Sequence, residues 1–183
     1  MSNEYAALSG DYTIDTAHSR VGFVARHAMV TKVRGSFDEF EGSIHLDGET
    51  PEKSSGKVTI QAKSINTRNS QRDDHLRSND FLDMDNQPEI TFASTGIKQT
   101  GDAEFVVSGD LSIRGVTKPV EIAFEYTGTA TDPFGNQRVG LEGSVVINRK
   151  DFGVSWNAAL ETGGVLVSEK VVLEFEISAV KQA

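Results

Sequence analysis

The sequence predicts an all-β protein, a closed barrel of eight antiparallel strands with one short helical segment. Eight segments alternate apolar and polar residues, so each predicted strand carries a single apolar face. Antiparallel strands that are apolar on one side must bury that side, either in a sandwich or in a barrel. Several of the predicted strands are long, and their edges carry few Pro or Lys residues. We favour the barrel because closure removes exposed strand edges.

Three strands precede the helical segment. The first begins near Tyr12, and its alternation places four residues on the inward face: Val21, Phe23, Ala25 and His27. The second strand spans residues 33–46, and its alternation changes phase near Asp38 and Glu39, which indicates a bulge. The third strand spans residues 57–65, and its inward residues are Val58, Ile60 and Ala62.

Residues 67–83 form the only long segment that does not resemble a strand, and they are rich in charged residues. Ser70 and Asp73 have the spacing of a capping box, although Glu or Gln usually occupies the second position. We therefore predict a short helix, which presses three apolar residues inward: Leu76, Phe81 and Leu82. The alternative is a solvated helical connection between two hairpins.

Five strands follow the helical segment, and their alternating residues are predicted to face inward. These residues are Ile90 and Phe92; Phe105, Val107, Gly109, Leu111 and Ile113; Val120, Ile122, Phe124 and Tyr126; Val139, Leu141, Gly143, Val145 and Ile147; and Val171, Leu173, Phe175, Ile177 and Ala179. Between the last two strands, residues 150–167 are too long for a hairpin loop, and loops of this length are usually functional or disordered. This segment holds Phe152 and the only tryptophan, Trp156. We expect it to gate the barrel together with residues 67–83; the alternative is that Trp156 plugs the barrel as part of the core.

Aromatic residues and glycines share the inward phase of these strands. The phenylalanines are Phe23, Phe37, Phe92, Phe105 and Phe124, and the glycines are Gly35, Gly42, Gly109 and Gly143. Glycine weakens a strand interior, so it indicates either a bend at a barrel corner or space that no side chain fills. An eight-stranded barrel can hold one small ligand. Aromatic walls with glycine gaps suit a long, thin apolar ligand. The alternative, which the sequence supports equally, is a filled core in which the glycines serve backbone bends.

Length and composition limit the classes of function. The 183 residues indicate one domain, which we place at residues 10–181, with a disordered tail over residues 1–9. The net charge of -9 argues against nucleic-acid partners and against adhesion to anionic membranes. The absence of Cys excludes disulfides and thiol chemistry. No apolar run approaches the ~18 residues of a membrane span, and no signal peptide is seen. We expect a cytoplasmic protein, or a secreted one if a leader has been removed.

Several motifs occur together along the chain. They are Asp15-x-x-His18-Ser19-x-Val21-x-Phe23-x-x-x-His27; Gly35-x-Phe37 and Gly42; Thr67, Arg72-Asp73-x-His75-Leu76 and Phe81; Pro88-x-Ile90-x-Phe92; the run from Gly109 to Val120; and Arg149-x-Asp151-Phe152-Gly153. In this order, over residues 10–179, they resemble the YceI-like, polyisoprenoid-binding family. The resemblance implies an extended lipocalin-like barrel with a helical segment beside it, whose interior takes a long isoprenoid or similar aliphatic chain. Members are often secreted or periplasmic, and the family establishes no reaction.

The inward phase and the resemblance together give a set of candidate ligand-binding residues: Phe23, His27, Phe37, Arg72, His75, Phe81, Phe92, Phe105, Leu111, Phe124, Arg149, Phe152 and Trp156. His27 is either a ligand contact or a hydrogen-bonded core residue. Arg72, Asp73 and His75 either meet a polar head group at the barrel mouth or include an Arg–Asp pair that ties the helix to the barrel. Arg149 faces a phosphate or carbonyl oxygen, or pairs with an acid on a neighbouring strand. We interpret His18 as structural.

The leading hypothesis is a lipid carrier or sequestering protein, not an enzyme, with a polyprenyl phosphate or an isoprenoid quinone tail as its ligand. No cofactor is expected, and the four scattered histidines show no metal-ligand spacing. The alternative is an enzyme that acts on a lipid or small metabolite, with His27 or His75 as acid or base. A third hypothesis is a structural or stress-response protein whose barrel is full. The oligomeric state stays open, and an isologous homodimer would be ordinary.

Overall fold

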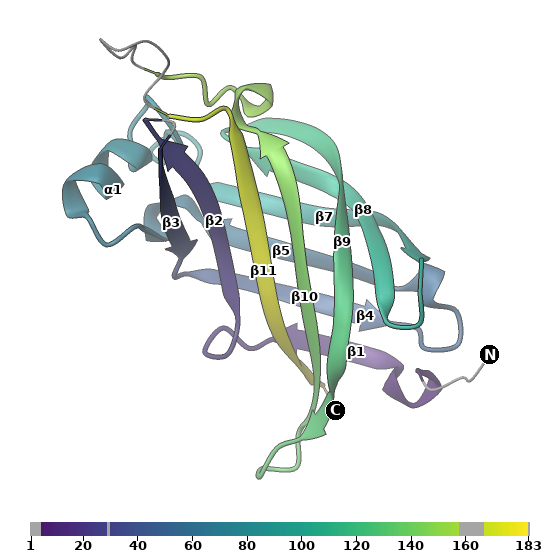
Figure 1. The fold of residues 1–183 in the computed structure, drawn as a ribbon. Helices are drawn as coiled ribbons and strands as arrows, with labels where there is room; N and C mark the ends of the chain where they lie inside the picture. Colours follow the sequence, from purple (N-terminus) through teal and green to yellow (C-terminus); the bar gives the residue numbers. More distant parts are fainter. Residues whose placement is uncertain (1–4, 29, 158–166, 183) are drawn as a thin grey trace.

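The computed structural model describes residues 5–28, 30–157 and 167–182, which form a closed antiparallel barrel (Figure 1). The strands are β1 (Gly10–Ile14), β2 (Arg20–His27), β3 (Thr31–Phe37), β4 (Phe40–Leu46), β5 (Ser55–Gln61), β6 (Ile65–Asn66), β7 (Glu89–Gln99), β8 (Glu104–Ile113), β9 (Val116–Thr131), β10 (Gln137–Asn148) and β11 (Lys170–Lys181). The helices are α1 (Ser70–Arg77) and the 3-10 turns η1 (Ala6–Leu8), η2 (Pro51–Lys53), η3 (Ala62–Ser64) and η4 (Arg149–Phe152).

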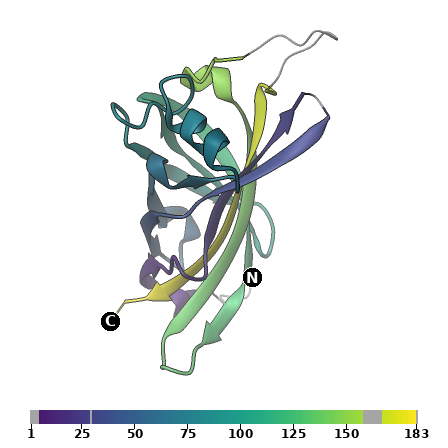
Figure 2. The ribbon, with the colours of Figure 1, turned by 90° about the vertical axis from the view of Figure 1, so that its left-hand side faces the viewer.

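Eight strands close the barrel in the order β1-β4-β5-β7-β8-β9-β10-β11, and β11 returns to pair with β1. This arrangement confirms the predicted eight-stranded antiparallel barrel with one short helix. Strands β2, β3 and β6 continue the sheet beyond β11, because the first half of β11 pairs with β2 and its last residues pair with β1. The hairpin of β2 and β3 and the helix α1 therefore lie at one end of the barrel, opposite the hairpin of β9 and β10 (Figure 2).

The first three predicted strands are each interrupted in the structure. The first is divided into β1 and β2 at residues 15–19, and the third into β5 and β6 by η3. The second is divided into β3 and β4 at Asp38 and Glu39, where the change of phase indicated a bulge. The interruptions let each strand pair with two different neighbours. β3 pairs with β2 and β6, whereas β4 pairs with β1 and β5.

The helix α1 differs from its prediction in how its N-terminus is capped. Its N-cap is Asn69, whose side chain accepts a hydrogen bond from the Arg72 amide at 3.0 Å, so the predicted Ser70–Asp73 capping box is wrong. The helix ends at Arg77, and the turns that follow bury Phe81. Leu76 and Leu82 pack against the core, as the sequence predicted. Among the described residues, no helix is long and apolar enough to cross a membrane.

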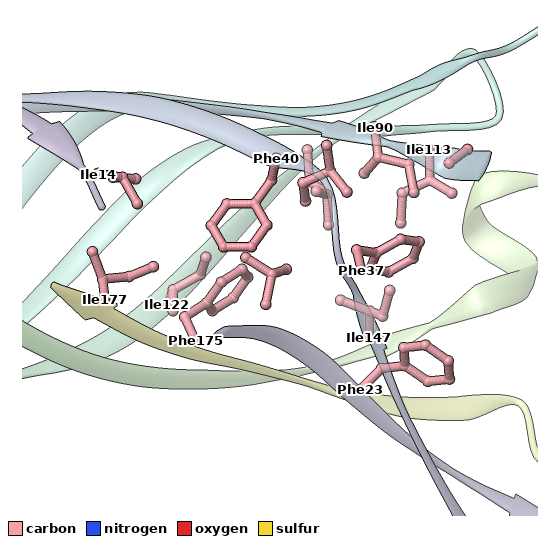
Figure 3. Close-up of a cluster of buried hydrophobic side chains, with 14 of the residues drawn as sticks. Ile14, Phe23, Phe37, Phe40, Ile90, Ile113, Ile122, Ile147, Phe175 and Ile177 are labelled. Atoms are coloured by element: carbon pink, nitrogen blue, oxygen red, sulfur yellow. The ribbon is translucent and has the colours of Figure 1, made fainter. Parts of the chain in front are cut away.

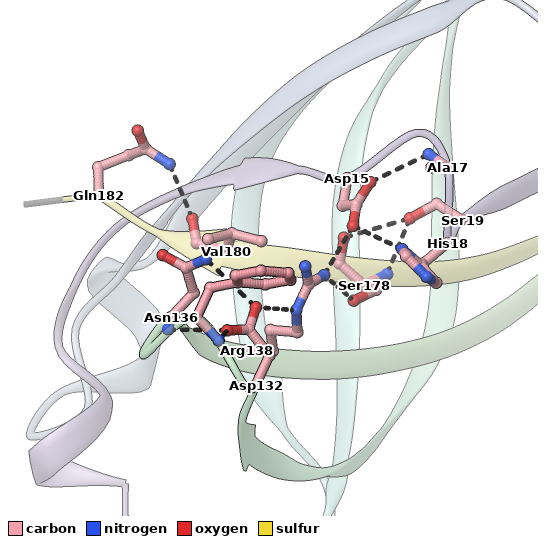
Figure 4. A network of polar contacts seen from close by, with 11 residues as sticks. Asp15, Ala17, His18, Ser19, Asp132, Asn136, Arg138, Ser178, Val180 and Gln182 are labelled. Carbon is pink, nitrogen blue, oxygen red and sulfur yellow. Dashed lines mark hydrogen bonds and ion pairs between the residues drawn. The ribbon is translucent and has the colours of Figure 1, made fainter.

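A network of polar contacts ties the break between β1 and β2 to the hairpin of β9 and β10 (Figure 4). Arg138 donates to the Asp15 carboxylate at 2.6 Å and to the Asp132 carboxylate at 2.8 Å. His18 Nδ1 lies 2.8 Å from Asp15, consistent with the structural role expected of this turn. Hydrogen bonds from Arg138 and then His18 lower the pKa of Asp15 to about 2. The pKa of Asp132 is also lowered to about 2, mainly by a hydrogen bond from the Asn136 backbone amide and then by one from Arg138.

Three of the four inward glycines, Gly35, Gly109 and Gly143, lie beneath aromatic rings of neighbouring strands. A Cβ atom on Gly109 would lie 2.5 Å from the Phe92 ring and 2.6 Å from the Ala93 carbonyl oxygen. On Gly143 it would lie 2.5 Å from the Phe124 ring. The interpretation of these glycines as gaps for a ligand is therefore wrong, because phenylalanine rings already occupy the space above them. Figure 3 shows the buried side chains that gather inside the barrel.

We expect Gly109→Ala and Gly143→Ala to lower the free energy of unfolding by roughly 1–3 kcal/mol, because the added methyl group overpacks the ring and the neighbouring carbonyl. Gly96→Ala is the matched control, since its Cβ would meet no atom within 4 Å. Urea unfolding of the three variants measures the effect. Equal stability of all three would show that the rings move aside without cost.

We expect Arg138→Ala to make the protein more sensitive to acid. Both carboxylates have a folded-state pKa below the unfolded value of ~3.9, so their contribution is present above about pH 4 and is lost as the pH falls toward 2. Removing the guanidinium raises the pKa of Asp15, so the variant should unfold at a higher pH. The measurement is the urea midpoint as a function of pH. Lys63→Ala, whose exposed amine lies 3.7 Å from Glu39, is the control, and an acid profile of Arg138→Ala that matches it would contradict the prediction.

Candidate functional site

The barrel encloses one long apolar cavity of about 290 Å³. Every strand from β1 to β11 contributes at least one lining residue, and most of the lining residues are aliphatic or aromatic. The charged residues in the lining are Asp47, Lys57 and Arg149. A surface of this composition can bury hydrocarbon but offers few polar partners to a ligand.

The cavity is narrow for its length. On β10 the lining extends from Val139 to Ile147. These eight residue steps correspond to ~26 Å of strand, or ~20 Å along the barrel axis at a tilt of 35–45°. The volume is nevertheless just below the usual range of small-ligand pockets, ~300–1,000 Å³. The space therefore fits a thin linear chain better than a compact, multi-ring ligand.

The predicted aromatic wall is present. Five phenylalanines of the strands line the cavity, as the sequence predicted, and so do Leu111 of β8 and Phe152 of η4. The five are Phe23, Phe37, Phe92, Phe105 and Phe124. Phe92, Phe105 and Phe124 face inward and yet are only half-buried, because the empty cavity leaves part of their surface accessible. Their contact with a ligand stays a prediction.

Three other candidate residues form an aromatic cluster beside the cavity. The His75 ring packs edge-on against Trp156 and Phe81, with centroid distances of 4.7 and 5.0 Å. Its Nε2 atom lies 2.8 Å from the Asp80 carboxylate. The cluster residues do not line the cavity themselves, although Leu82, next to Phe81, does. Trp156 thus packs against α1 and the loop that follows it, outside the cavity lining.

Arg72 and Asp73 both bind Thr67 and do not pair with one another. Arg72 donates to the Thr67 hydroxyl at 2.7 Å and to its carbonyl at 2.8 Å. The Asp73 carboxylate accepts from the Thr67 amide at 2.9 Å, and both Asp73 and Thr67 are buried. The predicted Arg–Asp pair is therefore wrong. The two side chains instead hold the loop that leads into α1.

His27 lies outside the cavity. Ala25 is the last residue of β2 that lines it, and beyond that point the hairpin of β2 and β3 extends past the end of the barrel. His27 is exposed there and forms an isolated bridge with Val167. Alternation correctly gave the phase of β2, but it could not show where the barrel ends. The inward placement predicted for His27 is wrong.

Arg149 lines the cavity, but its hydrogen bonds go to the backbone. It is buried at 5% exposure, and burial lowers the pKa of its guanidinium. The guanidinium donates to four carbonyls: Val154 at 2.7 Å, Ser168 at 2.8 Å, Trp156 at 3.0 Å and Val167 at 3.2 Å. The predicted pairing with an acid of a neighbouring strand is wrong, because Arg149 binds carbonyls on both sides of the segment from residue 157 to 166.

The expected gate over residues 150–167 lies partly outside the described residues, which omit 158–166.

The opposite end of the cavity is formed by residues that the sequence placed in a disordered tail. Residues 1–4 lie outside the described part of the chain, but η1 and its neighbours are ordered. Tyr5 and Leu8 line the cavity, and Leu8 is buried. The Tyr12 hydroxyl donates to the Leu8 carbonyl at 2.8 Å. The short sequence before β1 has no periodic pattern, so only its contacts in the folded barrel could reveal this role.

We expect Arg149→Met to lower the free energy of unfolding by about 2–4 kcal/mol. The substitution removes the guanidinium donor from four carbonyls, of which that of Val167 keeps a second side-chain donor, Asn157, and a hydrogen bond to a charged group contributes ~1.5–3 kcal/mol before the loop relaxes. Arg34→Met, whose side chain is 61% exposed, is the control. Thermal unfolding and the emission maximum of Trp156 measure the effect. A melting temperature equal to that of the control would contradict the structural role.

Comparisons with known proteins agree with this geometry. A model of the YceI-like domain matches residues 12–179. A UPF0312 protein of Azotobacter vinelandii is 41% identical over 150 residues, which cover 81% of this chain and 78% of that protein. The crystal structure of BcnA from Burkholderia cenocepacia has a TM-score of 0.80 at 23% identity, covering 90% of this chain and 98% of that one.

A second solved structure, from Saccharophagus degradans, is described as a polyisoprenoid binding domain implicated in plant cell wall breakdown. It has a TM-score of 0.72 at 16% identity and covers 93% of this chain and 98% of that one. At these identities the two solved structures show a shared fold. The family model covers nearly the whole barrel, and it confirms the resemblance found in the sequence motifs. The chain belongs to the YceI-like family.

Proposed function

We propose that this protein binds a long-chain isoprenoid lipid inside the barrel and acts as its carrier or sequestering protein. The observation that carries the proposal is the long, narrow cavity with an almost wholly apolar lining. A polyprenyl phosphate and an isoprenoid quinone are the candidate ligands, because each has a linear apolar chain with a polar head. The polyisoprenoid-binding description of the structure from Saccharophagus degradans supports the same class of ligand.

The affinity would come from apolar burial. Removing hydrocarbon from water contributes ~25 cal/mol per Å², so each isoprene unit that enters the cavity strengthens binding. The cavity is already formed, which lowers the cost of ordering the protein around the ligand. The head group would remain at the end near α1, where Arg149 lines the cavity; the other charged residues of the described lining are Asp47 and Lys57.

The two alternative functions have less support. An enzyme with His27 as acid or base would need that ring near the substrate, but His27 is exposed at the end of β2. His75 also lies outside the lining, with Nε2 beside Asp80. A structural protein with a filled barrel is disfavoured by the cavity itself.

We expect Val107→Trp to reduce isoprenoid binding by at least tenfold. Val107 lines the cavity, and the larger side chain would occupy the ligand's space. Val106→Trp is the matched control, because Val106 pairs with the exposed Ala123 and does not line the cavity. Titration with geranylgeraniol, followed by native mass spectrometry, measures the difference.

The wild-type protein supplies the direct test. Lipid extracted from the freshly purified protein should contain an isoprenoid chain, identified by mass spectrometry. Saturable binding of geranylgeraniol should also shift the fluorescence of the protein. If no isoprenoid co-purifies and none binds at saturating concentration, the proposed function is wrong.

A further inference from the structure

We propose that Tyr5 and the turn η1 close the end of the cavity opposite α1 and set the longest chain that the barrel accepts. The inference rests on the proposed function, and it adds a residue that determines ligand length. The N-terminal turn lies at the far end of the barrel from α1 (Figure 1). Its residues Tyr5 and Leu8 are part of the cavity lining, so a chain that enters near α1 would meet them last.

The Tyr5 side chain is held by aromatic and polar contacts with β8, β9 and the turn between β7 and β8. It packs edge-on against Tyr126 of β9 and Phe105 of β8, with centroid distances of 5.3 and 5.8 Å. Both partners also line the cavity. The Tyr5 hydroxyl donates to the carbonyl of Asp102 in the turn between β7 and β8. The ring therefore spans the end of the cavity from the N-terminal turn to β8 and β9.

Gly48 makes room for this turn. A Cβ atom on Gly48 would collide with the Tyr5 carbonyl and would lie 2.9 Å from Ala6 Cα. The Gly48 amide donates to the Ser9 hydroxyl at 2.8 Å, which holds the two segments together. Any side chain at this position would displace the backbone of the N-terminal turn. The closure thus depends on two separate segments of the sequence.

The consequence is a limit on chain length. While the tail of a ligand remains short of Tyr5, each further isoprene unit buries new apolar surface and should strengthen binding roughly tenfold or more. Once the tail reaches the ring, further units stay outside the cavity and add nothing. The end of the cavity, and not the head group, then determines which chain length binds best.

The test uses linear isoprenoid alcohols of increasing length, from geraniol through farnesol and geranylgeraniol to solanesol. Dissociation constants are measured for the full-length wild type, Tyr5→Ala, Tyr5→Trp and Gly48→Ala. Phe134→Ala is the aromatic control, because Phe134 is 88% exposed in the turn between β9 and β10 and does not line the cavity. Gly96→Ala is the glycine control. Circular dichroism and the melting temperature establish that each variant is folded.

We expect the wild-type affinity to rise with length and then to level off. Tyr5→Ala and Gly48→Ala should move the levelling point by at least one isoprene unit toward longer chains, whereas Tyr5→Trp should move it toward shorter ones. Both controls should match the wild type. An unchanged levelling point in folded Tyr5→Ala and Tyr5→Trp would overturn the inference, even if Gly48→Ala failed to fold.

The same variants separate this inference from the proposed function. If the wild type binds no isoprenoid alcohol, the proposed function fails, and the series is repeated with straight-chain alkyl alcohols. A length limit for alkyl chains that moves in Tyr5→Ala would support closure by Tyr5. An unmoved limit, or no binding of either series, would overturn it.

Discussion

The pairing of β1 with both β4 and β11 is the constraint on which the barrel depends. β1 has only five residues, yet it joins two strands that would otherwise be edges. Without this pairing the barrel would open along its side, and the cavity lining would meet water. Tyr12 and Ile14 are buried at the junction, and Asp15 continues it through Arg138. Closure also determines where the chain before β1 lies, so it places η1 at the end of the cavity.

Closure alone does not produce a narrow cavity, because the inward side chains of an eight-stranded barrel can also fill it. Here the rings of Phe92 and Phe124 lie across Gly109 and Gly143 of neighbouring strands. Each ring thereby lies close to the wall and leaves the barrel axis free. Because each ring lies over a glycine, it does not extend to the barrel axis. This packing explains how an interior rich in aromatic residues still holds a cavity about 20 Å long.

The sequence predicted the features that depend on local alternation. It gave the eight strands and the inward phase of the phenylalanines, and the bulge that it predicted at Asp38 and Glu39 is a break between β3 and β4. It did not give the features that depend on where the barrel ends. His27 has the inward phase but lies past the rim, and Arg149 follows an inward row but is bound by loop carbonyls. Tyr5 belongs to a short segment that is placed by contacts with residues distant in the sequence, among them Phe105 of β8 and Tyr126 of β9.

The two ends of the cavity are built in different ways, and this separates two properties of a ligand. Near α1, Arg149 is bound to backbone carbonyls, so its charge is held in place but most of its hydrogen-bonding capacity is already used. At the opposite end, the described lining includes the rings of Tyr5, Phe105 and Tyr126, and Asp47 beside Gly48 also belongs to it. In the proposed complex one end of the cavity adjoins the head group and the other the tail, so head-group preference and chain length would depend on different residues. The shared wall between them recognises only hydrocarbon, so a substitution at either end can change one property without disturbing the other.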